Sequence, residues 1–225
     1  ARALVQMPPA SREMVLRMAF KKAGILGCFA PMQWRRKELD YVCQEIDPSA
    51  IFVSLDTMED DQKAWLDEKL AGGAEPSVRV SLSPQPPAGW LGWGGGIKAC
   101  EDTQAREQIA DRQFRFDEVS LITASSGTSG IAKLCEWPEA AQICIGRGTV
   151  PRLGITQDDN IGMFAPMSGA AGVLVWVMSG TTPCTYTFPA TYDAKALLTL
   201  IGDVKITVAT TVPVTTRRRP QARAA

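Results

Sequence analysis

The strongest constraint on the fold of this chain is a regular alternation of short β-branched, apolar runs with longer amphipathic runs. The short runs predict strands and the longer runs predict helices, because apolar residues recur with the spacing of each element. Through residue 110 we expect strands at 4–7, 27–31, 50–55 and 78–82 and helices at 11–22, 36–46, 58–70 and 101–110. This order predicts an α/β fold, with a mostly parallel sheet covered by helices on both faces.

The same alternation continues after a loop at residues 83–96 that is rich in proline and glycine. There we expect strands at 119–124, 161–165, 185–188 and 204–210 and helices at 139–146, 170–178 and 193–202. Asp193 is expected to cap the last helix at its N-terminus.

Three helices have an expected buried face, because their apolar residues recur at helical spacing. In helix 11–22 this face is Met14, Val15, Met18 and Ala19. In helix 36–46 it is Leu39, Val42, Cys43 and Ile46. In helix 193–202 it is Ala196, Leu197, Leu200 and Ile201.

The composition excludes several classes of function. The 225 residues are 45% apolar, and 24 basic residues balance 24 acidic ones, so the net charge predicts neither a nucleic-acid groove nor an anionic membrane surface. The chain contains no histidine, which excludes Ser-His-Asp and Cys-His triads and zinc sites that need imidazole.

The cysteines and the N-terminus predict a cytoplasmic protein. No C-x-x-C pair occurs, and most cysteines have apolar neighbours, so we expect small buried thiols in a reducing compartment. The six are Cys28, Cys43, Cys100, Cys135, Cys144 and Cys184. The first residues do not read as a signal peptide. Residues 160–192 carry no charge, but Pro166 and several glycines favour buried core elements over a membrane span.

The most specific chemical feature is the segment at residues 125–133, which follows an expected strand and reads S-S-G-T-S-G-I-A-K. Its two glycines let successive backbone N–H groups converge on one point, its hydroxyl groups add donors, and its lysine adds a positive charge. It is not a Walker A loop, because leucine follows the lysine. The segment predicts a loop that binds the phosphates of a nucleotide, with an ordinary Ser/Gly-rich turn as the alternative. Its expected phosphate-binding residues are Ser125, Ser126, Gly127, Thr128, Ser129, Gly130 and Lys133.

This segment resembles the phosphate-binding signature of the adenylate-forming superfamily, whose usual form is T-S-G-T-T-G-x-P-K. The superfamily includes acyl- and aryl-CoA ligases, the adenylation domains of peptide synthetases, and luciferases. The resemblance begins near residue 3, includes A-F-K-K-A-G at 19–24 and R-K-E-L-D-Y-V at 36–42, and continues to about residue 214. Ala132 replaces the usual proline, Ser129 replaces a threonine, and the histidine that often follows the loop is absent. Both replacements are expected to preserve the phosphate site.

The resemblance implies activation of a small-molecule carboxylic acid by ATP with Mg²⁺. The carboxylate would attack the α-phosphate, pyrophosphate would leave, and the acyl group would pass from the adenylate to a thiol, commonly coenzyme A. The resemblance also implies an acyl pocket at a small, apolar segment, similar to that of ligases for aromatic or alicyclic acids. Its expected residues are Met167, Ser168, Gly169 and Gly172.

The resemblance covers part of the superfamily's pattern. Residues 1–216 resemble part of the large N-terminal domain, and residues 217–225 are expected to be a disordered Arg/Ala-rich tail. The Y-G-x-T-E and T-G-D motifs and the late lysine of the superfamily are not in the sequence. We therefore expect the chain by itself to be inactive, and an exposed apolar face to favour self-association.

Two other functions fit parts of the sequence. A non-catalytic half-domain or interaction protein would keep the fold without binding Mg-ATP. Alternatively, Ser125, Ser126 and a distant lysine resemble the histidine-free triad of Ser-Ser-Lys amidases, although the flanking segments match the ligases.

Overall fold

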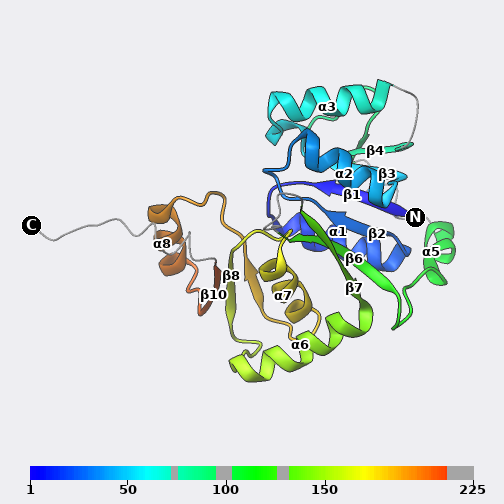
Figure 1. Ribbon diagram of the computed structural model, residues 1–225. Coiled ribbons are helices and arrows are strands. Elements are labelled where there is room, and N and C mark those ends of the chain that lie inside the picture. Colours follow the sequence, from blue (N-terminus) through cyan, green and yellow to red (C-terminus); the bar gives the residue numbers. More distant parts are fainter. Residues whose placement is uncertain (72–75, 95–102, 126–131, 212–225) are drawn as a thin grey trace, which may run out of the picture. The chain divides into compact units, whose positions relative to one another are not determined.

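The structure, a computed structural model, describes residues 1–71, 76–94, 103–125 and 132–211 (Figure 1). The chain forms two compact units: Ala1–Pro8 with Val15–Glu139, and Pro9–Met14 with Ala140–Ala225. Each unit contains a parallel sheet with helices, so the expected α/β class is confirmed. The expected tail at 217–225 lies outside the described residues.

The first unit is built on a seven-stranded sheet in the order β5-β4-β3-β1-β2-β6-β7. Every neighbouring pair is parallel except β6 and β7, which are antiparallel, so the sheet is mostly parallel as predicted. The strands are β1 (Arg2–Gln6), β2 (Leu26–Phe29), β3 (Ala50–Val53), β4 (Val78–Ser81), β5 (Leu91–Gly92), β6 (Val119–Ser125) and β7 (Lys133–Pro138). The sequence analysis predicted neither β7 nor the short β5, which lies in the expected loop.

Helices cover both faces of this sheet (Figure 1). They are α1 (Ser11–Ala23), α2 (Arg36–Ile46), α3 (Asp60–Ala71) and α5 (Thr103–Ala110), with a 3-10 turn, η1, at Leu55–Thr57. On one face, α2 and α3 pack on a core that includes Leu4 and Ile51, which are partners across β1 and β3. On the other face, Phe20 of α1 contacts the rings of Phe29 and Phe52, with centroids 6.1 and 5.0 Å away.

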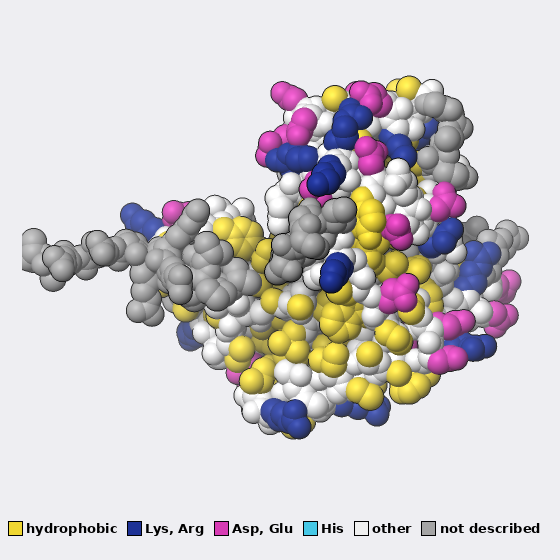
Figure 2. All heavy atoms as spheres, viewed as in Figure 1, with side chains coloured by type: hydrophobic (Ala, Val, Ile, Leu, Met, Phe, Trp, Pro, Cys, Tyr) yellow, Lys and Arg dark blue, Asp and Glu magenta, His cyan; other side chains and the backbone are white. Residues whose placement is uncertain are grey.

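The outer surface of α2 and α3 carries both signs of charge (Figure 2). Arg36 of α2 and Glu68 of α3 form an exposed ion pair at 2.7 Å. The hydrogen bond from Arg36 lowers the pKa of the Glu68 carboxyl.

The predicted buried face of helix α1 is wrong. Val15 is 56% exposed and Met18 is 45% exposed, and the helix instead buries Leu16, Arg17 and Phe20. Arg17 can lie inside because its guanidinium stands 4.0 Å from the centroid of the Phe29 ring, an attractive cation–π geometry. A buried arginine thus occupies a position that the apolar spacing assigned to solvent.

The cysteines only partly follow the prediction that they are small buried thiols. Cys28 and Cys43 lie in the core, where burial raises the pKa of these thiols to about 12 and about 11. Cys144, in contrast, is exposed on α6, which buries Gln142, Gly146 and Val150. Cys100 lies outside the described residues, and the described cysteines are free thiols.

The second unit contains a three-stranded parallel sheet in the order β10-β8-β9. Its strands are β8 (Asn160–Phe164), β9 (Thr185–Thr187) and β10 (Val208–Thr211). Its helices are α6 (Glu139–Leu153, of which Glu139 belongs to the first unit), α7 (Ala170–Ser179) and α8 (Ala194–Asp203). Asp193 caps α8 as predicted, because its carboxylate accepts a hydrogen bond from the Ala196 N–H at 3.0 Å.

Polar side chains at the start of β8 tie the three strands together. The Thr207 hydroxyl donates to Asp159 at 2.7 Å, and the Thr187 hydroxyl donates to the Asn160 side chain at 2.8 Å. The Asn160 amide nitrogen donates to the Val204 carbonyl at 2.8 Å. These bonds connect β8 with β9 and with the segment that leads into β10.

Two boundaries in this unit differ from the prediction. Helix α6 continues past Gly146, which was the predicted end. This glycine does not end the helix but serves its packing against α7, where an added Cβ would stand 2.6 Å from the Val177 carbonyl oxygen. The last strand begins at Val208 and not at residue 204, because Val204 caps α8 and Lys205 has a left-handed φ of 54°.

Among the described residues, no helix has the length and apolar character needed to cross a membrane. Helix α7, inside the uncharged stretch, has ten residues, whereas a bilayer span needs about 20.

Candidate phosphate-binding site

Ser125 and Lys133, which flank the candidate loop, lie at the edge of the large sheet where its parallel strands end. In the order β2-β1-β3-β4-β5 the strands follow the arrangement of flavodoxin-like doubly wound sheets, and ligands of such sheets bind beyond the carboxyl ends of the strands. Strand β6 runs parallel to β2, so the segment after Ser125 emerges at this edge. Ser125 therefore lies at the edge of the sheet beyond which ligands of this class of sheet bind, although β6 is not one of the two strands, β1 and β3, at the switch point.

Strands β6 and β7 form a hairpin that holds the two ends of the loop side by side. Ser125, the last residue of β6, is the cross-strand partner of Lys133, the first residue of β7. The Ser125 hydroxyl donates to the Lys133 carbonyl oxygen at 3.4 Å. The other expected phosphate-binding residues, Ser126, Gly127, Thr128, Ser129 and Gly130, lie outside the described residues.

The pairing places Lys133 on the face of the hairpin opposite to that of Ile122 and Leu134. Side chains alternate along a strand, and Ile122 and Leu134 belong to the apolar core or pack against it. Ser125 and Lys133 therefore share the opposite face, and Lys133 is exposed. Among the residues that the structure describes, no carboxylate forms an ion pair with its ammonium group.

A second cross-strand bond, which sequence reasoning missed, lies on the same face. The Trp137 indole N–H donates to the Thr123 hydroxyl at 2.9 Å. Thr123 is 2% exposed. The available sequence signal was the recurrence of Lys133, Cys135 and Trp137 at every second position after the loop, which is the spacing of a strand.

An ion pair anchors the base of the hairpin. The Lys21 ammonium lies 2.6 and 2.8 Å from the two carboxylate oxygens of Glu139, and these side chains are 23% and 14% exposed. The Glu139 N–H also donates to the Glu118 carbonyl at 3.0 Å. Because Glu139 directly follows β7, these contacts fix the end of the hairpin opposite the loop.

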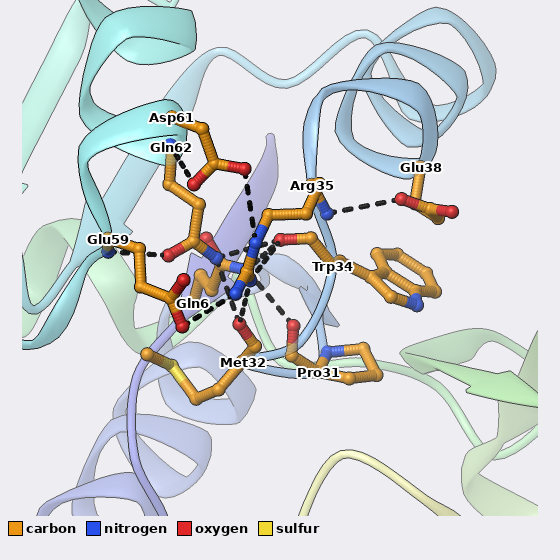
Figure 3. Close-up of polar contacts among 9 residues, drawn as sticks. All are labelled: Gln6, Pro31, Met32, Trp34, Arg35, Glu38, Glu59, Asp61 and Gln62. Carbon is orange, nitrogen blue, oxygen red and sulfur yellow. Dashed lines mark hydrogen bonds and ion pairs between the residues drawn. The ribbon is translucent and has the colours of Figure 1, made fainter.

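The neighbouring turn after β2 is held by two buried glutamines (Figure 3). Gln6 and Gln62 are each 1% exposed. The Gln6 amide nitrogen donates to the Pro31 carbonyl at 3.0 Å. The Gln62 amide nitrogen donates to the carbonyl groups of Met32 and Trp34 at 2.9 and 2.7 Å. Side-chain amides thus satisfy backbone acceptors that no strand or helix could pair.

Arg35 completes this cluster from the start of α2 (Figure 3). Its guanidinium forms ion pairs with Glu59 at 2.6 Å and Asp61 at 3.2 Å, and it donates to the Met32 carbonyl at 3.1 Å. The Glu38 carboxylate accepts from the Arg35 N–H at 3.1 Å, as in a helix cap. The turn and the starts of α2 and α3 therefore form one hydrogen-bonded assembly at the carboxyl edge of the sheet.

The expected acyl-pocket residues lie together in the second unit, in the turn from β8 to α7 and in the first turn of α7. Met167 is fully buried, whereas Ser168 and Gly169 are partly exposed. Gly169 precedes α7, and its carbonyl accepts from the Val173 N–H at 3.1 Å. A Cβ on Gly172 would stand 2.3 Å from the Met167 Cα and carbonyl oxygen. In this structure Gly172 therefore serves a close approach of two backbone segments.

In the described part of the chain, no group of three or more Cys, Asp or Glu side chains is arranged to hold a metal ion.

The model of the family "AMP-binding enzyme" matches residues 1–222 of the 225 in the chain. The chain belongs to this family. The match confirms the resemblance to adenylate-forming enzymes, which rested on residues 125–133 and the segments around them.

Three known proteins are similar to this chain over part of their own length. Pseudomonine synthase PmsE of Pseudomonas entomophila (strain L48) is 29% identical over 133 residues, which are 59% of this chain and 21% of that protein. Apo MbtA of Mycobacterium smegmatis has a TM-score of 0.80 and 17% identity, over 96% of this chain and 39% of that one. The o-succinylbenzoate CoA synthetase MenE of Bacillus subtilis, in complex with the acyl-adenylate intermediate OSB-AMP, has a TM-score of 0.69 and 11% identity, over 96% and 50%.

At such low identity the two structures show that the fold is shared. The chain spans at most half of the length of these three proteins.

Proposed function

We propose that this chain belongs to an enzyme that activates a carboxylic acid with ATP to an acyl-adenylate and then transfers the acyl group to a thiol. The observation that carries the proposal is the β6–β7 hairpin, which holds Ser125 opposite Lys133 at the carboxyl edge of a parallel sheet. Membership of the AMP-binding family supports the activation of an acid in general.

The chemistry requires stabilisation of charge more than it requires a base. The carboxylate attacks the α-phosphorus and pyrophosphate departs, so negative charge collects on the β- and γ-phosphates. Lys133, which is exposed at the loop end of the hairpin, supplies a full positive charge to these phosphates. The backbone N–H groups of 127–130 and the hydroxyls of Ser126, Thr128 and Ser129 would donate hydrogen bonds to them.

For the acceptor we propose coenzyme A, which would make the reaction one that forms a carbon–sulfur bond. The support is the resemblance to CoA ligases and the similarity in fold to an o-succinylbenzoate CoA synthetase. A thiol other than coenzyme A is the alternative.

For the acid we propose that the turn of Ser168 and Gly169 forms part of the pocket wall, and that Met167 and Gly172 hold this turn from behind. The partly exposed positions of the turn carry no large side chain, which leaves room for a ring.

We also propose that the chain by itself binds Mg-ATP without completing adenylation. The Y-G-x-T-E and T-G-D motifs and the late lysine, which act in catalysis elsewhere in the superfamily, are not among its 225 residues. A cytoplasmic location and self-association stay predictions.

The test is thermal unfolding with and without Mg-ATP. A phosphate site in the chain should raise the melting temperature, since a ligand at 100 times its Kd stabilises by about 2.7 kcal/mol. Lys133→Met should lose most of this shift. Lys22→Met, which removes another exposed lysine of the same unit, should keep it.

Absence of the shift in the unmodified chain would contradict the proposal and favour the non-catalytic half-domain. ATP–pyrophosphate exchange by the 225-residue chain would contradict the statement that it does not adenylate by itself. Labelling by a serine-directed fluorophosphonate would favour the amidase.

A further inference from the structure

We infer that Trp137 and Thr123 are positioning residues for the phosphate-binding loop, because their hydrogen bond keeps β7 in the register that places Lys133 opposite Ser125. The inference rests on the function proposed for the loop. Neither side chain belongs to the loop, and both lie toward the base of its hairpin.

The pairing pattern puts the bond and the lysine on one face of the hairpin. Leu121 pairs with Trp137, Thr123 with Cys135, and Ser125 with Lys133, so these three pairs follow each other at the two-residue spacing of one face. The Trp137 indole reaches diagonally to Thr123, one pair nearer the loop. The next pair along the same face contains Lys133.

The contacts of Glu139 fix the base of the hairpin, but between that base and the loop the register needs a further device, because it is otherwise weakly specified. Strand β7 is the edge of the sheet, so β6 is its one partner among the described strands. Leu134 on one face and Cys135 and Trp137 on the other are all partly buried, so burial alone discriminates little between the two faces. The pairing already shifts between Val119 and Leu121.

A shift of one residue would have a large effect on the loop. Because side chains alternate, such a slip exchanges the two faces of β7 and turns Lys133 toward the side on which Leu134 packs. The Lys133 ammonium would then leave the face that it shares with Ser125, and the phosphate site would lose this positive charge. The indole N–H resists the slip because an indole can only donate, and the Thr123 hydroxyl accepts from it in the observed register.

Cross-linking tests the register directly and needs no ligand. Ser125→Cys with Lys133→Cys reports the observed pairing, and Ser125→Cys with Leu134→Cys reports a slip by one residue. Opposed Cβ atoms about 4.5–5.5 Å apart are near enough for a disulfide after small adjustments. Peptide mapping by mass spectrometry separates these cross-links from those of the native cysteines.

The cross-linked fraction of each cysteine pair is measured in the parent chain and again after Trp137→Phe or Thr123→Val. Trp137→Phe removes the hydrogen-bond donor and Thr123→Val removes the acceptor, while each new side chain stays close in shape to the old one. We expect either change to lower the in-register fraction and raise the slipped fraction. The double variant should resemble each single one, because all three lack the same bond. Trp65→Phe is the matched control, since it removes an indole bond of 2.8 Å to Asp40 between α3 and α2.

The Trp65→Phe variant should lose stability and keep the parent pattern. A cross-link pattern unchanged in Trp137→Phe, or additive effects in the double variant, would overturn the inference.

The ligand readout separates this inference from the function on which it rests. Trp137→Phe should weaken the binding of Mg-ATP by about 2- to 10-fold, the range that the loss of one hydrogen bond produces, while Trp65→Phe should not. If the parent binds Mg-ATP and Trp137→Phe binds it equally well, the positioning role is refuted and the proposed function stands. If the parent does not bind Mg-ATP, the proposed function and the positioning role both fail.

Discussion

Replacing Gly172 by alanine should destabilise the protein, although alanine is the better helix former. Gly172 lies in the first turn of α7, and an added Cβ would meet the Met167 backbone at 2.3 to 2.5 Å. The nearest of these atoms is about 1 Å closer than an ordinary contact. Backbone atoms cannot turn aside as a side chain can, so either α7 or the turn before it must move.

The expected size follows from two opposing contributions. Overpacking of this kind costs about 1–3 kcal/mol, and the gain in helix propensity returns about 0.5–1 kcal/mol. The net loss should therefore be on the order of 1–2 kcal/mol, which lowers the melting temperature by about 2–8 °C in a chain of this size.

Gly148 supplies the matched control in the same unit. It lies inside α6, and an added Cβ would meet no atom within 4 Å. Gly148→Ala should therefore stabilise by about 0.5–1 kcal/mol, through helix propensity alone. Thermal unfolding followed by circular dichroism should give changes of opposite sign for the two substitutions. If Gly172→Ala proved as stable as the parent chain, the close approach to Met167 would not be the reason for a glycine there.

Two further predictions concern polar contacts. Gln62→Met removes two donated hydrogen bonds at a buried position and should lower stability by about 1–3 kcal/mol in urea unfolding, whereas the exposed Gln44→Met should change it by less than about 0.5 kcal/mol. Equal effects would refute the role given to Gln62. The second prediction depends on pH: the hydrogen bonds from the Thr207 hydroxyl and then from the Thr156 N–H lower the pKa of the Asp159 carboxyl. A carboxyl whose pKa is lowered by folding stabilises the folded state above its unfolded pKa of about 3.9. This stabilisation is lost as the pH falls through the folded pKa. Asp159→Asn should therefore melt below the parent at pH 7, and the gap should close below about pH 4; a gap that stays constant with pH would contradict this assignment.

The elements that the sequence predicted well are those with a local cause. Helix α2 has the predicted bounds, because its four buried residues recur at helical spacing. The cap of α8 was readable because Asp193 precedes an apolar run and bonds to a backbone N–H three residues later. Neither inference required knowledge of what packs against the helix.

The elements that were missed depend on partners far away in the sequence. The orientation of α1 is set by Phe29 and Phe52 of two strands, which accept Phe20 and Arg17 in place of the more continuous apolar face. Strand β7 ends in a proline and carries charges, so its strand character comes from pairing with β6 and not from its composition.

The residues of the candidate site also fall into those that a local sequence pattern predicts and those that depend on distant partners. Ser125 and Lys133 were found because the motif is contiguous in the sequence. The contact between Trp137 and Thr123 depends on the register of two strands, which no local pattern specifies. Gly172 was singled out for an acyl pocket, and its contact with Met167 shows a packing role that only the path of the backbone reveals.

The cluster around Arg35 has a consequence for how this protein can change through evolution. Gln6, Gln62 and Arg35 hold the turn after β2 by its carbonyl oxygens, which every amino acid possesses. The shape of the turn is thus largely independent of the side chains at positions 32 and 33. Those positions can vary between descendants of this sequence at little structural cost, while the three residues that grip the backbone cannot. A surface segment beside the proposed nucleotide site is in this way open to new side chains without a new fold.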